Sequence, residues 1–260
     1  MVLYFYRLPP PEVVELAPVS SPPHFFWKVI MTEQMPQLVD DAHTLATAVL
    51  VHRVLRPQGD GPFPTVVMIH GRAGNEDVMW IFRRTLPQNW LVVAPRAIKP
   101  DPDGGYSWHP RQPGEWPSLS SFGEAVTAVF QFLHALPILY NADPNQIYLM
   151  GFSQGAATAI ATALQHPTLV QGIASLVGFI PPHHQTAIAH RPLHNMPVFM
   201  AVGKKDPLIP LHISRTSATA LRQAGANLFY QEYDTGHKLN VAGMRDLTAW
   251  WQARAQALTL

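Results

Sequence analysis

Gly151-Phe152-Ser153-Gln154-Gly155 is the stretch that decides the fold, because it places a serine between two different structural patterns. Ile147-Tyr148-Leu149-Met150 before it is apolar and strand-like, and the alanine-rich run that follows, up to His166-Pro167, is typical of a buried helix. Glycines on both sides of the serine permit a strained turn and a close approach of strand and helix. The stretch therefore predicts that the Ser153 hydroxyl is exposed at the tip of a strand-to-helix turn, in the position of a nucleophile. The alternative is a glycine-flanked turn that carries a surface serine.

A serine hydroxyl becomes a good nucleophile only when a base removes its proton, so a histidine and an orienting acid are expected downstream. The strand pattern Pro197–Gly203 runs into a proline-stiffened loop that contains Asp206. The strand pattern Leu228–Tyr233 is followed by a loop that contains His237. Catalytic groups of parallel sheets collect at the carboxyl ends of strands. We therefore predict a catalytic triad of Ser153, Asp206 and His237.

Asp234 is a rival for the role of the acid, because it lies only three residues before His237. An acid so close in the same tight loop would usually cap the N–H groups of that loop instead. Asp206 follows a different strand and reaches the histidine independently. We therefore expect Asp206 to be the partner of His237.

The loop after the strand pattern Thr65–Ile69 is rich in small residues and reads His70-Gly71-Arg72-Ala73-Gly74-Asn75. Small residues let main-chain N–H groups approach a substrate and stabilise an oxyanion. We predict that the oxyanion hole consists of the backbone N–H groups of Arg72 and of Gln154, the residue after the nucleophile. His70 precedes the serine in the chain, and we expect it to brace the loop rather than to take part in catalysis.

With these segments in hand, the chain resembles the phospholipase/carboxylesterase family of α/β-hydrolases, which includes acyl-protein thioesterases and small bacterial carboxylesterases. One departure is Arg72, because thioesterases of the family favour leucine in this loop, followed by Gly-Asp. The matching pieces span about residues 65 to 240: His70-Gly71, Gly105-Tyr106-Ser107-Trp108, Gly151-Phe152-Ser153-Gln154-Gly155-Ala156, Gly178-Phe179-Ile180-Pro181, Gly203-Lys204-Lys205-Asp206 with Ile209-Pro210, and Gly236-His237.

The resemblance implies an α/β-hydrolase fold, with a mostly parallel central sheet covered by helices on both faces. It also implies a serine hydrolase without cofactor or metal, which cleaves carboxylic esters or thioesters with small to medium acyl chains through an acyl-enzyme. The alternative is a catalytically silent protein of this fold that binds a small apolar ligand. For the acyl pocket we predict Trp108, Trp116, Phe179, Ile180 and Met79, each of which could equally be a core residue.

Charge and composition argue against several classes of function and of binding site. A formal net charge of +1 over 260 residues and a charged fraction of 13% give no basic field for nucleic acid. The absence of cysteine excludes a disulfide scaffold and a thiolate metal site. Pro192 interrupts the helical spacing of His190 and His194, so no metal site is predicted there. No membrane span and no export signal are recognised, which makes the cytoplasm the expected location, while the oligomeric state stays open.

Two segments are predicted: a proline-rich N-terminal extension over residues 1–36, and one α/β-hydrolase domain over residues 37–260. The extension either wraps the domain through Phe25, Phe26 and Trp27, or precedes a natural start at Met31 or Met35. Alternating strand and helix patterns indicate a mostly parallel sheet. Strands are expected at Thr47–Leu55, Thr65–Ile69, Trp90–Ala94, Ile147–Met150, Gly172–Val177, Pro197–Val202 and Leu228–Tyr233, and helices at Asp77–Thr85, Ser120–Leu136, after Ser153, at Pro210–Ala224 and at Ala242–Ala257.

Overall fold

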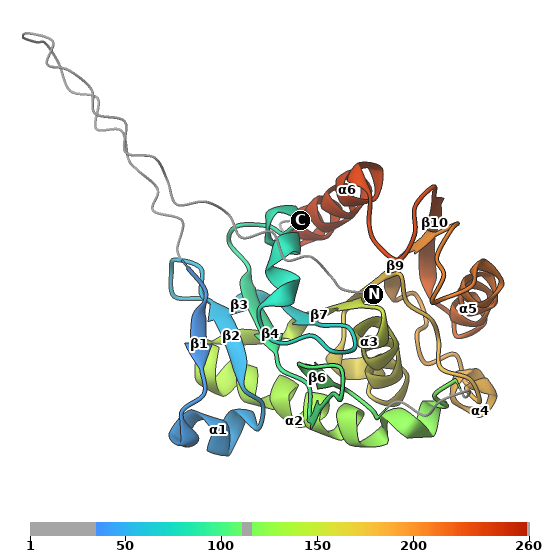
Figure 1. Ribbon diagram of the computed structural model, residues 1–260. Helices are drawn as coiled ribbons and strands as arrows, with labels where there is room; N and C mark the ends of the chain where they lie inside the picture. Colours follow the sequence, from blue (N-terminus) through green and yellow to red (C-terminus); the bar gives the residue numbers. More distant parts are fainter. Residues whose placement is uncertain (1–34, 111–115, 259–260) are drawn as a thin grey trace, which may run out of the picture. The chain divides into compact units, whose positions relative to one another are not determined.

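A computed structural model describes residues 35–110 and 116–258, so nearly all of the proline-rich extension lies outside the described residues. Its centre is an eight-stranded sheet with the order β1-β2-β4-β3-β7-β8-β9-β10 (Figure 1). From β4 to β10 all neighbouring strands are parallel, and β1 and β2 are antiparallel additions at one edge. The strands are β1 Gln37–Val39, β2 His52–Leu55, β3 Phe63–Ile69, β4 Leu91–Pro95, β7 Ala142–Phe152, β8 Gly172–Leu176, β9 Pro197–Gly203 and β10 Asn227–Tyr233.

Helices cover both faces of this sheet, as the alternating pattern predicts. One hydrophobic cluster includes residues of α2, α3 and α5, and a second includes residues of η1 and α6. A short hairpin, β5 Lys99–Pro100 with β6 Tyr106–Ser107, forms a separate antiparallel pair. The helices are α1 Ala42–Ala48, η1 Val78–Thr85, η2 Leu119–Phe122, α2 Gly123–Tyr140, α3 Gln154–Gln165, η3 Pro167–Leu169, α4 Gln185–Ile188, α5 Leu211–Gln223 and α6 Val241–Ala257.

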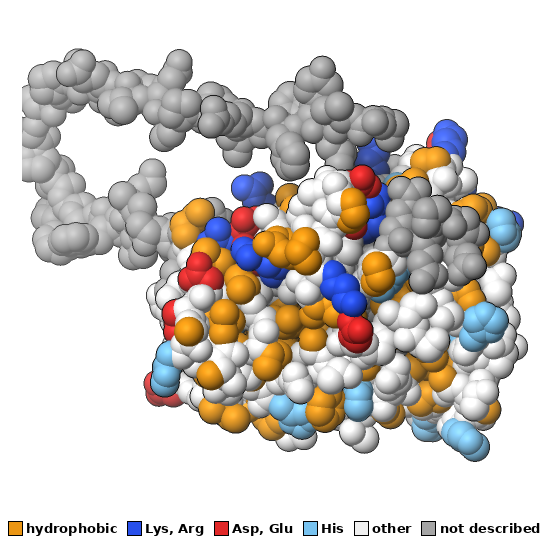
Figure 2. Space-filling view, turned by 60° about the horizontal axis from the view of Figure 1, so that its bottom comes forward, with side chains coloured by type: hydrophobic (Ala, Val, Ile, Leu, Met, Phe, Trp, Pro, Cys, Tyr) orange, Lys and Arg blue, Asp and Glu red, His pale blue; other side chains and the backbone are white. Residues whose placement is uncertain are grey.

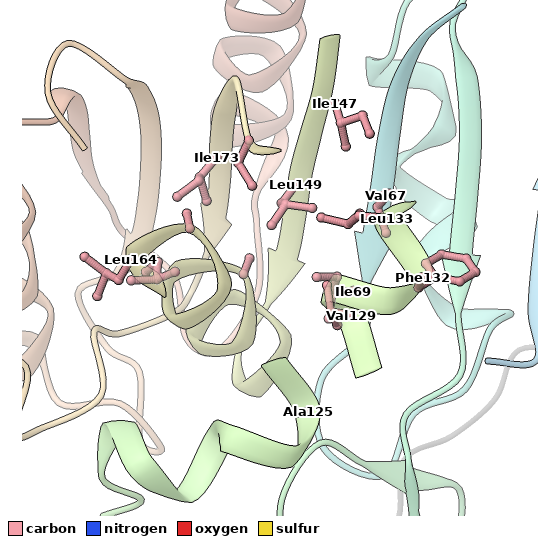
Figure 3. Packing of buried hydrophobic residues seen from close by; sticks show 14 of the residues in the cluster. Val67, Ile69, Ala125, Val129, Phe132, Leu133, Ile147, Leu149, Leu164 and Ile173 are labelled. Atoms are coloured by element: carbon pink, nitrogen blue, oxygen red, sulfur yellow. The ribbon is translucent and has the colours of Figure 1, made fainter. Parts of the chain in front are cut away.

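The central strands are apolar on both sides, and successive side chains enter opposite clusters. In β3, Val67 and Ile69 belong to the first cluster, while Val66 and Met68 belong to the second. Figure 3 shows the first cluster, in which side chains of the strands pack against α2 and α3. Burying an aliphatic side chain of this size stabilises the fold by about 1.5–3 kcal/mol. The two clusters therefore fix the sheet between its two helical layers.

The sequence prediction of a strand over Thr47–Leu55 is wrong in its first half, where the chain completes α1 instead. The Asp41 carboxylate accepts the Thr44 N–H at 2.9 Å and so caps the helix N-terminus. The helix ends at Val49 in a left-handed conformation with φ 59°, which a β-branched residue seldom adopts. The strand starts only at His52. Because valine is rarely found in this conformation at a helix end, nothing in the sequence indicates that α1 ends at Val49.

Helix α2 is the one segment of the described residues that could cross a membrane by length and composition alone. Within Leu119–Tyr140, which comprises η2 and α2, an 18-residue window has a mean hydropathy of 1.4. In this structure the Val129, Phe132 and Leu133 side chains are buried in the first cluster, so the helix belongs to the protein core. Its outward side carries Ile138, which is 76% exposed. Figure 2 turns the underside of Figure 1 toward the reader, and apolar side chains are interspersed with histidines on it.

Substitution of Gly155 tests how tightly α3 packs against the sheet. A Cβ atom at this position would lie 2.1 Å from the Ile69 carbonyl oxygen. Gly155→Ala should therefore lower the free energy of unfolding by about 3 kcal/mol, as measured by urea denaturation. Gly123→Ala is the matched control, since a Cβ atom there meets nothing within 4 Å, and should stay within about 1 kcal/mol of the wild type. Equal stability of the two variants would contradict the close approach.

Candidate active site

Ser153 lies between β7 and α3 in a strained backbone conformation with φ 53° and ψ −117°. Such a conformation costs a non-glycine residue about 1–3 kcal/mol and persists only where the surroundings impose it. Here the Ser153 N–H donates to the Leu176 carbonyl of β8 at 2.9 Å. A Cβ atom on Gly151 would lie 2.3 Å from the Gly155 carbonyl oxygen, so only glycine fits beside the turn. The predicted strand-to-helix turn is therefore present.

Asp206 and His237 meet by a hydrogen bond of 2.7 Å between the carboxylate Oδ2 and the ring Nδ1. The Asp206 side chain is buried at 2% exposure and the His237 side chain is 16% exposed. The loops that carry them approach closely, because a Cβ atom on Gly203 would lie 2.1 Å from the Gly236 carbonyl oxygen. The His237 ring also contacts Phe152 edge-on, with 5.3 Å between ring centroids. The pair therefore lies beside the residue that precedes Ser153.

The surroundings of Asp206 favour its ionised form. Its Oδ1 accepts the N–H groups of Leu208 at 2.8 Å and Ile209 at 3.0 Å. Burial raises the pKa of Asp206, but the hydrogen bonds from His237 and from these two N–H groups outweigh it, so the pKa lies below its usual value. An ionised carboxylate only accepts hydrogen bonds, so His237 must carry a proton on Nδ1. In the neutral ring, Nε2 then keeps its lone pair for a proton.

Asp234 occupies a different environment. Its side chain is 66% exposed and forms an ion pair with the Lys205 ammonium at 2.7 Å. The hydrogen bond from Lys205 lowers the pKa of Asp234. Of the two candidate acids, the structure brings Asp206 to the histidine ring and directs Asp234 to a surface lysine.

The loop after β3 runs directly past the Ser153 turn. A Cβ atom on Gly71 would lie 3.2 Å from the Phe152 ring and 3.5 Å from the Ser153 Cβ. Arg72 follows immediately, and Gln154 is the first residue of α3, where N–H groups point away from the helix. The two predicted oxyanion donors thus belong to two segments that adjoin Ser153, one by contact and one along the chain. Their role stays a prediction.

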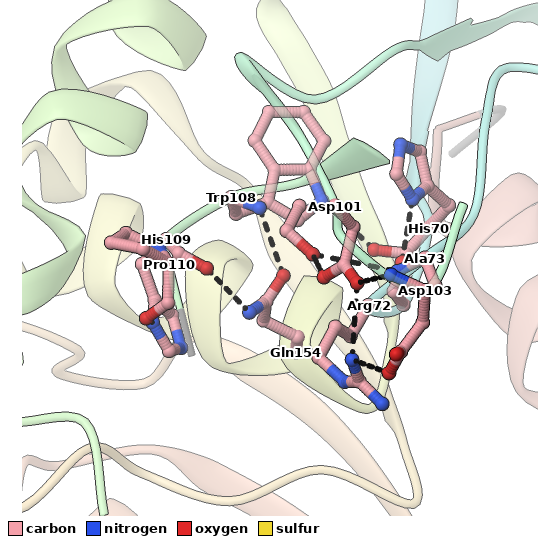
Figure 4. Close-up of polar contacts among 11 residues, drawn as sticks. His70, Arg72, Ala73, Asp101, Asp103, Trp108, His109, Pro110 and Gln154 are labelled. Atoms are coloured by element: carbon pink, nitrogen blue, oxygen red, sulfur yellow. Dashed lines mark hydrogen bonds and ion pairs between the residues drawn. The ribbon is translucent and has the colours of Figure 1, made fainter. Parts of the chain in front are cut away.

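The Gln154 side chain fixes a second loop to α3, the helix that follows Ser153. Its Oε1 accepts the Trp108 N–H at 2.8 Å, and its Nε2 donates to the His109 carbonyl at 3.2 Å (Figure 4). Trp108 in turn donates its indole N–H to the His70 carbonyl at 2.8 Å. The segment after β6 is therefore fixed to both the Ser153 turn and the loop after β3.

His70 is buried and braces the loop, in agreement with the sequence interpretation. Its Nε2 accepts the Ala97 N–H at 3.0 Å, so the ring proton is on Nδ1, which donates to the Gly71 carbonyl at 2.6 Å. Burial lowers the pKa of His70 to about 4, although the hydrogen bond to Gly71 opposes this shift. His70 is therefore neutral under ordinary conditions and joins the loop to the chain after β4.

The structure separates the five residues predicted for the acyl pocket. Trp116, which is 41% exposed, contacts the buried Phe179 edge-on with 4.9 Å between ring centroids. Phe179 clusters with Ile209, which follows Asp206, whereas Trp108 and Ile180 belong to the first core cluster. Met79 packs in the second cluster with the buried side of η1, apart from the others. Trp116 and Phe179 are the pair that the structure brings together.

Sequence reasoning missed four polar residues that contact the loop after β3 or its neighbours. Asp101 and Ser107 belong to the β5–β6 hairpin, and Glu76 pairs with Arg96 through two contacts of 2.7 and 2.6 Å. A turn-like Asp-Pro-Asp-Gly-Gly sequence gave no signal of a buried carboxylate. Across residues 35–110 and 116–258, no three His, Asp or Glu side chains gather into a group that could hold a metal ion.

Comparison with known proteins identifies the family. The model of the phospholipase/carboxylesterase family matches residues 56–253. This chain belongs to that family. A probable inactive carboxylesterase of Oryza sativa subsp. japonica is 31% identical over 121 residues, which are 45% of this chain and 49% of that protein. The putative esterase NocK of Nocardia uniformis subsp. tsuyamanensis is 25% identical over 232 residues, 78% of this chain and 58% of that protein. The chain thus spans about half the length of these two curated relatives.

A solved structure confirms the predicted fold class. The carboxylesterase of Bacillus cereus superposes with a TM-score of 0.71 at 20% identity, over 81% of this chain and 97% of that one. The chain therefore has the α/β-hydrolase fold, with helices on both faces of a mostly parallel sheet.

The environment of His70 predicts a pH dependence. The pKa of His70 is lowered from 6.5 to about 4, so the unfolded chain binds a proton that the folded one does not as the pH falls below 6.5. The stability contribution is therefore present above pH 6.5 and lost as the pH approaches 4, by about 3 kcal/mol. NMR of the imidazole nitrogens should show a neutral ring with a proton on Nδ1 at pH 5.5. A midpoint near 6.5 would contradict this assignment.

Proposed function

We propose that this protein is a serine hydrolase that cleaves carboxylic esters or thioesters with small to medium acyl chains. The observation that carries the proposal is the 2.7 Å hydrogen bond between Asp206 and His237, beside the strained Ser153 turn. Family membership supports hydrolysis of small esters, while the substrate itself is part of the proposal.

In the proposed reaction the Ser153 Oγ attacks the carbonyl carbon of the ester, and His237 Nε2 takes the hydroxyl proton. The tetrahedral intermediate collapses, the bond to the leaving oxygen or sulfur breaks, and His237 delivers the proton to the leaving alcohol or thiol. A water molecule then repeats the sequence on the acyl-enzyme and releases the acid. Asp206 holds the Nδ1–H tautomer throughout and stabilises the imidazolium that forms.

The oxyanion of each tetrahedral intermediate is proposed to receive hydrogen bonds from the backbone N–H groups of Arg72 and Gln154. Such preorganised donors lower the barrier by about 3–4 kcal/mol each in comparable sites. For the acyl chain we propose the contact pair of Trp116 and Phe179, because Phe179 clusters with Ile209 on the loop of the catalytic acid. Neither a metal nor a cofactor enters this scheme.

The second candidate is a catalytically silent protein of the same fold that binds a small apolar ligand. It is favoured by the rice relative, which is described as a probable inactive carboxylesterase. The two functions differ in one measurement: hydrolysis of p-nitrophenyl acetate and of a short-chain thioester by the purified protein. A silent binder would leave both substrates intact.

The first functional test is the nucleophile. Ser153→Ala should abolish ester hydrolysis, because no other hydroxyl is proposed to attack the carbonyl, and should leave the melting temperature nearly unchanged. A fluorophosphonate probe should label the wild type once, as measured by intact mass, and should leave the variant unmodified. Labelling of the variant at another residue would refute Ser153 as the nucleophile.

The second functional test compares the two acids. Asp206→Asn should lower kcat by about 10³–10⁴-fold, because the amide favours the wrong imidazole tautomer. Asp234→Asn is the matched control, since its carboxylate pairs with exposed Lys205, and should cost less than about tenfold. Both effects are read from initial rates on p-nitrophenyl acetate. The reverse ranking would assign the role of the acid to Asp234.

A further inference from the structure

The β5–β6 hairpin packs against the proposed oxyanion loop, which is defined here as residues 71–75. The Tyr106 N–H donates to the Gly74 carbonyl at 2.7 Å, and these two residues form an isolated β-bridge. A Cβ atom on Gly105 would lie 2.4 Å from the Ala73 carbonyl oxygen, so only glycine permits this approach. The hairpin and the oxyanion loop are therefore in direct backbone contact.

Asp101 is a buried carboxylate at the base of this hairpin, with its side chain 1% exposed. Its Oδ1 accepts the Asp103 N–H at 2.9 Å and the Arg72 guanidinium at 3.1 Å, and its Oδ2 accepts the Ser107 hydroxyl (Figure 4). Burial raises the pKa of Asp101, but the hydrogen bond from Ser107 and the other contacts outweigh it, so the pKa lies below its usual value. The carboxylate is thus ionised and acts only as an acceptor.

The orientation of the Ser107 hydroxyl follows from this charge. Ser107 must donate its proton to the Asp101 carboxylate, which leaves its oxygen lone pairs for another donor. That donor is the Ala73 N–H, at 3.4 Å. Ala73 has a φ of 58°, a conformation that a non-glycine residue keeps only where contacts impose it. Asp101 is therefore linked to the loop at two points: it binds the Arg72 side chain directly, and it is connected to the Ala73 N–H through Ser107.

A second ion pair supports the far end of the same loop. Glu76 is buried and binds the Arg96 guanidinium at 2.7 and 2.6 Å. The Arg96 guanidinium lies over the Tyr106 ring, 4.7 Å from its centroid. The hydrogen bond from Arg96 lowers the pKa of Glu76. The oxyanion loop is thus anchored to the hairpin by charge at both ends.

We propose that Asp101 is a positioning residue for the oxyanion hole, which it preorganises by fixing Arg72 and, through Ser107, the backbone at Ala73. This inference rests on the proposed function, because it assigns Asp101 to the loop whose Arg72 N–H stabilises the oxyanion. Asp101 touches neither the substrate nor the reacting atoms. Its effect is on the conformation of a donor whose misplacement by about 1 Å costs about 100-fold in rate.

Asp101→Asn is the sharpest variant, because it keeps the shape of the side chain and removes its charge. Arg72 and the Asp103 N–H both need an oxygen at the Oδ1 position, so the new amide NH₂ group must face Ser107. Ser107 then accepts from the amide, and its own buried proton loses the carboxylate that accepts it, so the hydroxyl must reorient next to the Ala73 N–H. Asp103→Asn is the matched control, since Asp103 is exposed and binds Arg72 at 2.7 Å without contacting Ser107.

The experiment measures kcat and KM on p-nitrophenyl acetate, and the affinity for a trifluoromethyl ketone whose hemiketal oxyanion occupies the hole. Asp101→Asn should lower kcat by about 10–100-fold with KM within about threefold, and weaken ketone binding by the same factor as kcat/KM. Asp103→Asn should stay within about threefold in all three quantities. Hydrogen exchange of the Ala73 N–H should become faster in Asp101→Asn alone.

A merely structural role predicts a different pattern: a lower melting temperature with unchanged ketone affinity per folded molecule. That pattern, or equal effects of the Asp101 and Asp103 variants, would overturn the inference. If Asp101→Asn fails to fold, Ser107→Ala replaces it, with an expected loss of about tenfold in kcat and in ketone affinity. Wild-type protein that neither hydrolyses the ester nor binds the ketone would refute the proposed function. The hydrogen-exchange rate of the Ala73 N–H would still test whether Asp101 fixes the backbone at Ala73.

Discussion

The closeness of helix α3 to the end of β3 is the constraint on which the site depends. The Gly155 backbone lies so near the Ile69 and His70 carbonyls that a Cβ atom would come within 2.1 and 2.4 Å of them. With the helix fixed there and β7 entering from the sheet, the single residue between them must turn sharply. Ser153 therefore adopts φ 53° and ψ −117°, and the two core clusters on either side of the sheet supply the energy that maintains this strain.

A second close approach assembles the other half of the site. Gly203 ends β9 and Gly236 follows β10, and the backbone contact between them draws their loops together. Because β3, β7, β8, β9 and β10 are successive neighbours in a parallel sheet, their carboxyl ends share one edge. Asp206 and His237 follow adjacent strands at that edge, so residues 31 positions apart in sequence meet at hydrogen-bond distance. The sheet places the two loops next to each other, and the two glycines allow their backbones to come into contact.

The fold and the three triad candidates could be predicted from the sequence because their patterns are local. In each case an apolar strand pattern is followed by a turn rich in glycine or proline. The family and the fold class are confirmed by comparison, and Asp206 rather than Asp234 faces His237. The features that could not be predicted from the sequence depend on contacts between segments that are distant in the chain. Asp101 lies in a turn-like sequence, and only the folded chain shows that its carboxylate contacts the loop of residues 71–75. Met79 packs in the second core cluster, and its part in a pocket stays a prediction. Helix α1 was missed because its end requires Val49 in an unfavourable conformation.

Arg72 supports the proposed oxyanion loop by charge, through two ion pairs. Its guanidinium binds the carboxylates of Asp101 and Asp103, of which Asp101 is buried. Of these, the buried Asp101 carboxylate also orients Ser107 toward the Ala73 N–H, so the backbone conformation depends on an ionised group. The contacts lower the pKa of Asp101, and its carboxylate therefore remains charged through the neutral range and into mild acid. On the other side, neutral His70 bonds the Gly71 carbonyl without adding a charge. The groups that hold the proposed oxyanion donor are thus an ion pair, Arg72 with Asp101, and a neutral His70 ring. Neither changes its protonation state in the neutral range, so these contacts persist when His237, the proposed base, gains and loses its proton.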